Sequence, residues 1–272
     1  MLQPGTETGI TFAGHHCAEY GAICRIERWP VLPKATVNKV AISGRNGSVR
    51  YPGKTYAERT LECLLYLVDP GGSYEPLGYP EMRDRLSQIA GWLGAEGRAP
   101  LTLDCTPDRY WIAEVEGVTE AEDTDWPSGA LDVSYTLQPY EYALHPHSIT
   151  VASAAATSQQ QVLYLDGTQP APLDMHITNT GPGALSYVWV GAGSWVQILS
   201  GMALPVGQHM SVWTDIEAGD VQRIEVRGQP GKRYLHQDSN CVTITLQPGR
   251  NVISYYTDRA CTVRWEARAR WL

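Results

Sequence analysis

The run Val263-Arg264-Trp265-Glu266-Ala267-Arg268-Ala269-Arg270-Trp271 alternates strictly between apolar and charged side chains. Successive side chains of a β-strand point to opposite faces, so Val, Trp and Ala share one face and Arg and Glu the other. This pattern predicts a half-buried strand with a charged outer face. Similar alternation recurs along the chain, separated by turns that its 26 Gly and 18 Pro favour, and this predicts a mainly β fold.

The second half reads as a helix-free β-sandwich built from short strands. Between the two halves, residues 145–161 are predicted to be a linker or an extended connection, because 152–161 is small and polar. Part of that connection could add an edge strand to the second domain. The strands expected in the second half are Leu173 to Thr178, Leu185 to Val190, Val196 to Leu199, Met210 to Thr214, Val221 to Arg227, Cys241 to Leu246, Asn251 to Thr257 and Thr262 to Leu272.

The first half combines a hairpin, one helix and further strands. Residues 37–43 and 49–51 alternate around an Asn-Gly turn at 44–48, which is a hairpin signal. Residues 79–93 carry apolar side chains at 82, 86, 89, 90 and 93, which form one helical stripe, and Gly94 can end the helix. Strands are expected at 101–104, 110–118 and 131–137.

Length and charge suggest two domains of different character. At roughly 150 residues per domain, 272 residues favour two domains, which we place at 1–147 and 148–272. Residues 1–147 hold 12 Lys and Arg against 20 Asp and Glu, whereas residues 148–272 hold 9 of each, so the net charge of −8 lies in the first half. No basic cluster of the kind that binds phosphates is found, so specific DNA or RNA binding is not expected.

The chain has no apolar run near the ~20 residues that cross a bilayer, so no membrane association is expected. Its N-terminus lacks a basic start followed by an apolar stretch, so we expect synthesis in the cytosol. The cysteines are widely and irregularly spaced, which favours free thiols. They are Cys17, Cys24, Cys63, Cys105, Cys241 and Cys261.

Motifs for chemistry are sparse. A Gly-x-Ser-x-Gly elbow and phosphate-binding glycine loops are absent from the sequence. His15, His16, Cys17 and Cys24 are of the residue types that bind zinc, but their spacing matches no standard zinc site. The alternative interpretation is a pair of histidines at a strand end, with cysteines that pack as small apolar side chains. An acidic run could supply glycosidase carboxylates, but such a run is usually a solvated edge. We therefore expect no enzyme activity, no metal and no cofactor. The acidic run consists of Glu114, Glu116, Glu120, Glu122, Asp123 and Asp125.

Trp265, Glu266 and Arg268 could bind a sugar, since an aromatic ring can stack on a pyranose while charged groups bind its hydroxyls. Strand alternation puts Trp265 on the face opposite Glu266 and Arg268, which favours a core tryptophan and surface charges. A carbohydrate-binding module pair with exposed tryptophans remains the alternative function. A third alternative, a glycoside hydrolase or an endopeptidase, lacks converging carboxylates or a nucleophile.

The chain contains, in this order, Ile10 to Gly14, Gly44-Arg45-Asn46-Gly47, Trp92-Leu93, Leu101 to Asp104, Pro107-Asp108-Arg109-Tyr110-Trp111, Gln138 to Tyr142 and Leu246 to Ile253. The order of these motifs resembles that of the distal tail proteins (Dit) of long-tailed siphophages. In that family a Gly-Arg-x-Gly turn, a Pro-Asp-Arg-Tyr strand entry and a Pro-Tyr near the domain end recur, and Leu246 to Ile253 is similar to the Leu-x-Pro-Gly-x-Asn-x-Ile hairpin of the family's galectin-like domain. The resemblance covers most of the chain.

The resemblance implies an N-terminal tail-tube-like β-sandwich or split barrel with one helix, and a C-terminal galectin-like β-sandwich (jelly roll). It implies a hexameric ring in the virion tail tip that joins the tail tube to the baseplate, with a DNA channel. The implied partners are further copies, tail-tube, tape-measure, and tail-tip or receptor-binding proteins. Six copies at −8 would carry −48, so we expect a negative lumen that does not grip DNA.

Interface candidates follow from the same motifs, with ordinary turn and strand chemistry within the domain as their alternative. The hairpin turn supplies one group, the strand entry supplies a second, and a loop at 69–78 supplies a possible intersubunit contact. The resemblance implies the galectin-like sandwich of the family for the second domain, but we do not infer a sugar-binding site from it. The candidates are Arg45, Asn46, Gly47, Asp108, Arg109, Tyr110 and Tyr74.

Overall fold

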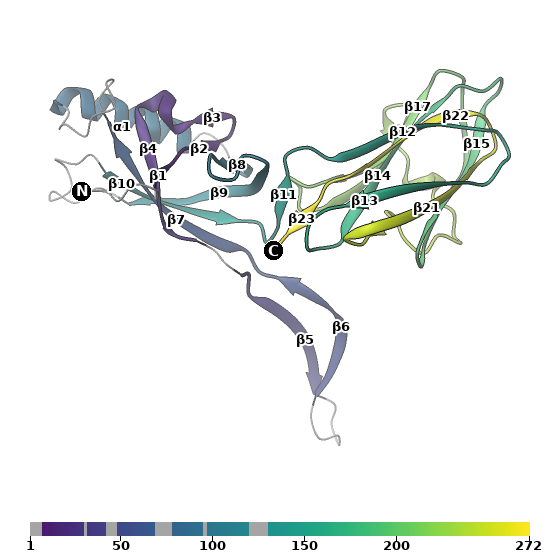
Figure 1. Ribbon diagram of the computed structural model, residues 1–272, viewed down its shortest axis with the longest axis horizontal. Coiled ribbons are helices and arrows are strands. Elements are labelled where there is room, and N and C mark those ends of the chain that lie inside the picture. The colour runs from purple at the N-terminus through teal and green to yellow at the C-terminus, as the bar shows by residue number, and fades with distance from the viewer. Residues whose placement is uncertain (1–6, 30–31, 42–47, 69–77, 95–96, 120–129) are drawn as a thin grey trace. The chain divides into compact units, whose positions relative to one another are not determined.

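The computed structural model describes residues 7–29, 32–41, 48–68, 78–94, 97–119 and 130–272, and it is mainly β, as predicted (Figure 1). The chain divides into two compact units, residues 1–141 with Leu272, and residues 142–271, and each is described by itself. The expected boundary at 147/148 falls within a strand of the second unit.

One large antiparallel sheet forms the first unit, in the strand order β1-β4-β7-β10-β9-β8-β2-β3. The strands expected at 101–104, 110–118 and 131–137 are confirmed as β8, β9 and β10. The elements are β1 (Glu7–Thr8), β2 (Ile10–Phe12), β3 (His15–His16), the 3-10 turn η1 (Cys17–Tyr20), β4 (Ala22–Arg28), β7 (Arg59–Leu67), α1 (Tyr79–Gly94), β8 (Ala99–Leu103), β9 (Arg109–Thr119) and β10 (Ala130–Leu137).

Helix α1 forms where the sequence predicts it and packs on one face of this sheet. Ile89 and Trp92 are buried in the core of the unit, whereas Ala90, which was placed on the apolar stripe, is exposed. The Trp92 ring stacks on Tyr20 at 4.8 Å between centroids, and its Nε1 donates to the Phe12 carbonyl oxygen at 3.0 Å. This buried hydrogen bond ties the helix to strand β2.

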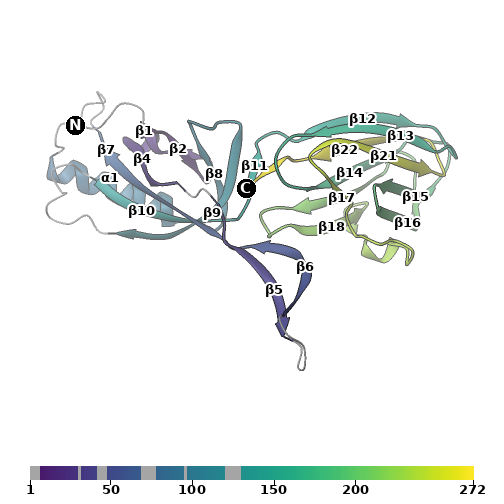
Figure 2. The ribbon, with the colours of Figure 1, turned by 60° about the horizontal axis from the view of Figure 1, so that its bottom comes forward.

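The predicted hairpin is confirmed as β5 (Ala35–Ala41) and β6 (Ser48–Tyr56). Among the described strands, these two pair only with each other, and Figures 1 and 2 draw them as a two-stranded ribbon separate from the large sheet. The turn that joins them lies outside the described residues.

Two antiparallel sheets that share one core form the second unit, as expected for a sandwich. One has the order β12-β22-β14-β17-β18-β19, with β20 on β14, and the other has the order β13-β21-β15-β16. The strands of the first sheet are β12 (His147–Ser153), β14 (Ala171–Asn179), β17 (His209–Asp215), β18 (Val221–Val226), β19 (Gln229–Pro230), β20 (Thr245–Leu246) and β22 (Cys261–Ala267), and those of the second are β13 (Gln159–Leu165), β15 (Leu185–Ala192), β16 (Trp195–Leu204) and β21 (Gly249–Thr257). Two short strands, β11 (Glu141–Ala143) and β23 (Arg270–Trp271), pair with each other outside these two sheets, and a 3-10 turn lies at Lys232–Tyr234.

The linker predicted at 145–161 is wrong for most of its length, because β12 and β13 lie there. Each is the edge strand of a different sheet: β12 pairs with β22, and β13 pairs with β21. An edge strand is held by backbone bonds to a single neighbour, so it needs few apolar side chains. The suggestion that part of the connection adds an edge strand is confirmed.

Three other expectations need correction. The strand expected at 241–246 shrinks to β20, because the Asn240 and Ser239 side chains bond to the backbone of Val196 and Ile198 on β16. The strand expected at 262–272 breaks into β22 and β23, because Arg268 turns to donate to two backbone carbonyl oxygens. The segment 246–253 is no hairpin, since β20 pairs with β14 and β21 with β13 and β15.

Candidate interaction sites

The strand entry at Asp108 and Arg109 lies within the first unit and bonds to its end. The Arg109 Nη1 donates to the Glu141 carboxylate at 3.2 Å, and its Nε lies 3.6 Å from Asp108. The Glu141 side chain is only 12% exposed, whereas that of Asp108 is 73% exposed. Tyr110 is half-buried beside them. This geometry favours the intradomain alternative for Arg109 over a free interface.

A second arginine converges on the same segment. The Arg59 guanidinium is buried and donates to the Pro139 carbonyl oxygen at 2.6 Å. Burial lowers the pKa of Arg59, while the nearby charge of Glu141 acts in the opposite direction. Two arginines from β7 and β9 therefore hold residues 139–141, where the first unit ends.

Several interface candidates lie outside the described residues. These are Arg45, Asn46 and Gly47 in the hairpin turn and Tyr74 in the loop before α1; the carboxylates Glu120, Glu122, Asp123 and Asp125 lie outside as well.

The zinc-like group of the sequence does not converge. Cys17 and Cys24 are buried free thiols, while His15 pairs with Glu19 at 2.9 Å and His16 with Asp104 at 3.2 Å. The pKa of Cys24 is raised by its hydrogen bond with Cys63, and next by burial. In the described part of the chain, no group of three or more His, Cys, Asp or Glu is arranged to hold a metal ion.

Glu114 and Glu116, the described carboxylates of the acidic run, each have a partner within the first unit. Glu114 lies 3.6 Å from Arg98, and Glu116 accepts a hydrogen bond from the Thr136 hydroxyl at 2.9 Å. Both are exposed on β9, as a solvated acidic edge requires.

The sugar candidates of the sequence separate as strand alternation predicts. Trp265 is 1% exposed in the core, with its ring 5.3 Å from that of Tyr255. Glu266 points outward beside Arg264, and Arg268 donates to the carbonyl oxygens of Ala143 and Leu144 at 2.6 Å each. A buried indole cannot stack on a sugar, so these three side chains do not form a binding site.

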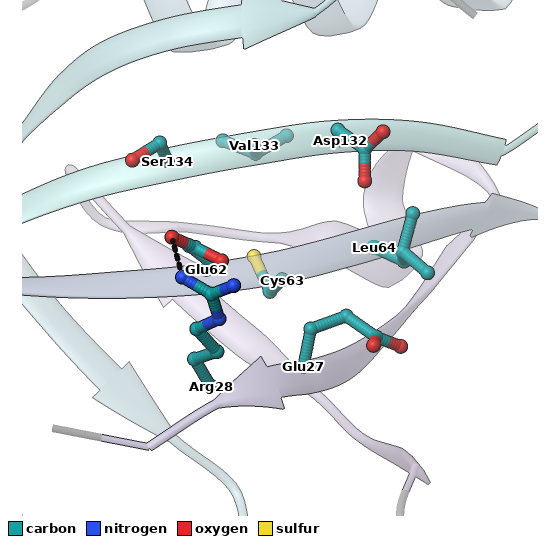
Figure 3. A pocket seen from close by; sticks show the side chains of 8 residues that line it. All are labelled: Glu27, Arg28, Glu62, Cys63, Leu64, Asp132, Val133 and Ser134. Atoms are coloured by element: carbon teal, nitrogen blue, oxygen red, sulfur yellow. Dashed lines mark hydrogen bonds and ion pairs between the residues drawn. The ribbon is translucent and has the colours of Figure 1, made fainter.

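A pocket of about 460 Å³ lies on β4, β7 and β10 of the first unit (Figure 3). Arg28 pairs with Glu62 at 3.2 Å across it, and Glu27 and Asp132 add two more carboxylates. The β4 register shifts between Ile26 and Arg28, so the alternation of β4 is interrupted where the pocket forms. Glu27 also pairs with Arg25 at 3.1 Å, so three carboxylates stand against two guanidinium groups, which disfavours phosphate. The pocket lining is Glu27, Arg28, Glu62, Cys63, Leu64, Asp132, Val133 and Ser134.

A charged cluster on the seven-stranded sheet of the second unit was not predicted. Asp174 and Glu266 are directly opposed on β14 and β22, and His176 Nε2 lies 3.6 Å from Glu266. Burial raises the pKa of Asp174 to about 7, although its carboxylate accepts a hydrogen bond from the Thr214 backbone N–H at 2.9 Å; Glu266 adds to the shift. Burial lowers the pKa of His176. Only the strand register, which no local motif encodes, brings these residues together.

No protein-family model and no curated protein matches the chain. Its fold defines a mainly β protein of two units, with one α-helix among the described residues of the first. Among solved structures it is similar to the crystal structure of SPP1 Dit (gp 19.1), titled a paradigm of the hub adsorption apparatus in phages that infect Gram-positive bacteria. The alignment covers 97% of this chain and 99% of that chain, with a TM-score of 0.64 and 14% identity. The resemblance to distal tail proteins is thereby confirmed for the fold.

A Bacillus thuringiensis Cry1Da tryptic core variant aligns over 93% of this chain and 54% of its own at 8% identity, with a TM-score of 0.19, which is too low to indicate a shared fold. Among the described residues, no helix is long and apolar enough to span a membrane.

Replacing Arg109 should destabilise the first unit, because the Glu141 carboxylate, mostly buried, loses its donor. We expect Arg109→Ala to lower the free energy of unfolding by about 1–3 kcal/mol. Asp108→Ala is the matched control, with an expected change within about 0.5 kcal/mol since that carboxylate is exposed. Urea denaturation measures both, and equal losses would contradict the assignment.

The second unit should lose stability as Asp174 ionises. Its folded pKa of about 7 lies above its ordinary value, so the folded state holds more protons and the free energy of unfolding falls as pH rises from about 4 to about 7. Asp174→Asn should match the wild type at pH 4 and exceed it by on the order of 3 kcal/mol at pH 8. Urea denaturation across this range is the measurement, and a stability difference independent of pH would refute it.

Proposed function

We propose that this chain is a structural component of a bacteriophage tail tip, a distal tail hub that joins the tail tube to the adsorption apparatus. The observation that carries the proposal is the alignment with SPP1 Dit, which spans 97% of this chain and so includes both units. A non-enzymatic role accords with the sites above, where carboxylates and histidines are engaged in pairs within the fold.

In this proposal six copies close into a ring around a channel for DNA. The supporting observation is a separation of charge within the first unit. Residues 34–56, the hairpin and the residue before it, contain five Lys and Arg and no Asp or Glu, while the rest of residues 1–141 contains seven Lys and Arg against twenty Asp and Glu. A basic segment and an acidic body on one chain suit head-to-tail contact between copies.

The hairpin has a second property that suits assembly. A two-stranded ribbon is marginally stable alone in water, and β5 and β6 pair with no other described strand. Trp29 and Leu32, just before β5, are exposed to 44% and 73%. Burial of these apolar side chains against a neighbour would stabilise both the hairpin and the ring.

The face of the large sheet that bears Glu27, Glu62 and Asp132 is proposed to face the channel. These three carboxylates outnumber the two arginines paired with them, Arg25 and Arg28, and a surface of that sign does not bind the phosphates of passing DNA. The second unit, proposed to be galectin-like, would then hold receptor-binding or other tail-tip proteins, with tail-tube and tape-measure proteins as further partners.

Self-assembly is tested by the absolute mass of the purified chain. Light scattering after size exclusion, over a dilution series, should give six or twelve times 30.0 kDa. Reversing the hairpin charge with Lys39→Glu, Arg50→Glu and Lys54→Glu should shift the population toward monomer by at least tenfold in dissociation constant, about 1.4 kcal/mol. The effect should weaken at high salt.

The matched control keeps the charge and changes the side chains, with Lys39→Arg, Arg50→Lys and Lys54→Arg. It should assemble like the wild type. A wild type that stays monomeric at every concentration would count against self-assembly, and a reversed hairpin that assembles normally would remove the hairpin from the contact.

The proposed lumen is tested in assembled tails. Glu27→Lys, Glu62→Lys and Asp132→Lys together should slow DNA ejection several-fold, because added cations attract the passing polyanion. Substitution of the same residues by Gln should have a smaller effect. Unchanged ejection by the lysine variant in intact particles would place this face away from the DNA.

A further inference from the structure

The two outer faces of the second unit differ sharply in charge. The seven-stranded sheet carries charged residues on β14, β17, β18 and β22, and these pair across the face, as in Arg223 with Asp215 at 3.0 Å. The four strands of the other sheet, all within the described residues, contain one charged residue, Arg250. An outward face without charge is unusual for strands that meet water on one side.

Aromatic side chains occupy the centre of this uncharged face. Trp189 on β15 lies directly opposite Tyr256 on β21, and the rings of Tyr187 and Tyr256 are 6.0 Å apart at 70°. All three are half-buried, although their strand neighbours Val188 and Tyr255 lie in the core. The two tyrosine rings are therefore in contact, and Trp189 lies on the same outward side of the sheet.

A glycine fixes how Trp189 lies on this surface. A Cβ atom added at Gly191 would come within 2.8 Å of Trp189 Cη2, the far end of the indole. Because Gly191 lies two residues further along the same strand, the indole must extend along β15 over that glycine. Any larger residue at 191 would force the ring away from this position.

The surroundings of the aromatic surface are neutral. Val162 and Val252 are paired beside it, and Ile198 lies opposite Trp189 on β16. Gln160 donates to the Ser254 hydroxyl at 3.4 Å. At one end of the aromatic surface, Tyr164 on β13 is paired with Arg250 on β21, and Tyr164 is 62% exposed.

We propose that this face, centred on Trp189, Tyr187 and Tyr256, binds a neutral oligosaccharide chain. The ring faces of Trp and Tyr carry negative partial charge and attract the polarised C–H groups of a pyranose. Gln160, Ser254 and Arg250 supply donors and acceptors for its hydroxyl groups. A face with one charge offers no means of selecting a charged ligand.

The size of the face distinguishes a sugar chain from a protein partner. Four strands at about 4.8 Å spacing span about 14 Å, and the uncharged stretch from Val252 to Tyr256 spans about 14 Å along β21. The resulting area, roughly 200 Å² in projection, is a quarter of the ~800 Å² of accessible surface that each partner of a stable protein complex buries. Although accessible surface exceeds projected area, the face is small for a protein partner. The β16 edge is also closed, since His236 and Asn240 donate backbone N–H groups to Ile198 and Val196 at 2.8 and 3.0 Å.

Affinity electrophoresis of the full chain tests the proposal, with neutral galactomannan, neutral mixed-linkage β-glucan or acidic polygalacturonate cast into native gels. The wild type should be retarded by at least one neutral polysaccharide. Trp189→Ala should weaken that retardation at least tenfold, and Trp189→Tyr, which keeps an aromatic ring, should retain binding within a few-fold. The two variants together separate loss of the ring from loss of the fold.

The matched control is Trp195→Ala. Trp195 is 37% exposed, and strand alternation places it on the other face of β16 from Val196 and therefore away from the proposed surface. It should bind like the wild type. The proposal is overturned by a wild type that no neutral polysaccharide retards, by equal retardation of Trp189→Ala, or by retardation with polygalacturonate alone. It is also overturned if Trp189→Ala leaves retardation intact and lowers the mass of an assembled form, since a second copy would then cover the face.

Discussion

Antiparallel pairing is the constraint on which this structure depends. Each paired strand must send alternate side chains to opposite faces, so a core on one side dictates what stands on the other. In the second unit, Val263, Trp265 and Ala267 are buried because β22 closes the core, and Arg264 and Glu266 then have no position except the outer face. The functional surfaces are consequently found among outward positions, and the pairing register decides which of those become neighbours.

Charge is distributed in the molecule on several scales. In the first unit it separates along the chain, between the basic segment 34–56 and the acidic remainder. In the second unit it separates between two sheets, one crossed by ion pairs and the other carrying Arg250 alone. Because the ion pairs of the charged sheet are satisfied within the fold, that sheet gains little from a charged partner. The uncharged sheet instead presents aromatic and neutral polar side chains on its outer face, which is why the proposed binding surface was placed there.

Local periodicity predicted most elements, because strand alternation and the helical stripe are both readable within one segment. It failed where stability comes from backbone pairing with a distant strand: β12 and β13 look like linker since their polar side chains contribute little to a core. Local periodicity also could not show that Asp174 lies opposite Glu266, or that Trp189 lies opposite Tyr256, because each pair joins strands far apart in sequence. The mutual approach of Arg59, Arg109 and Glu141 was hidden for the same reason, although Arg109 itself was selected from its motif.

The contrast between two tryptophans shows why residue type alone misleads in a sandwich. Trp265 and Trp189 both lie in strands with alternating environments, and the sequence analysis singled out Trp265 because charged residues adjoin it. Those charges lie on the other face, and the buried indole packs on Tyr255. Trp189 is flanked by Val188 and Val190, both in the core, so alternation turns its ring outward. Apolar flanks therefore identify the outward tryptophan and charged flanks the buried one, which follows from the period of two and reverses the intuition that polar neighbours mark a binding residue.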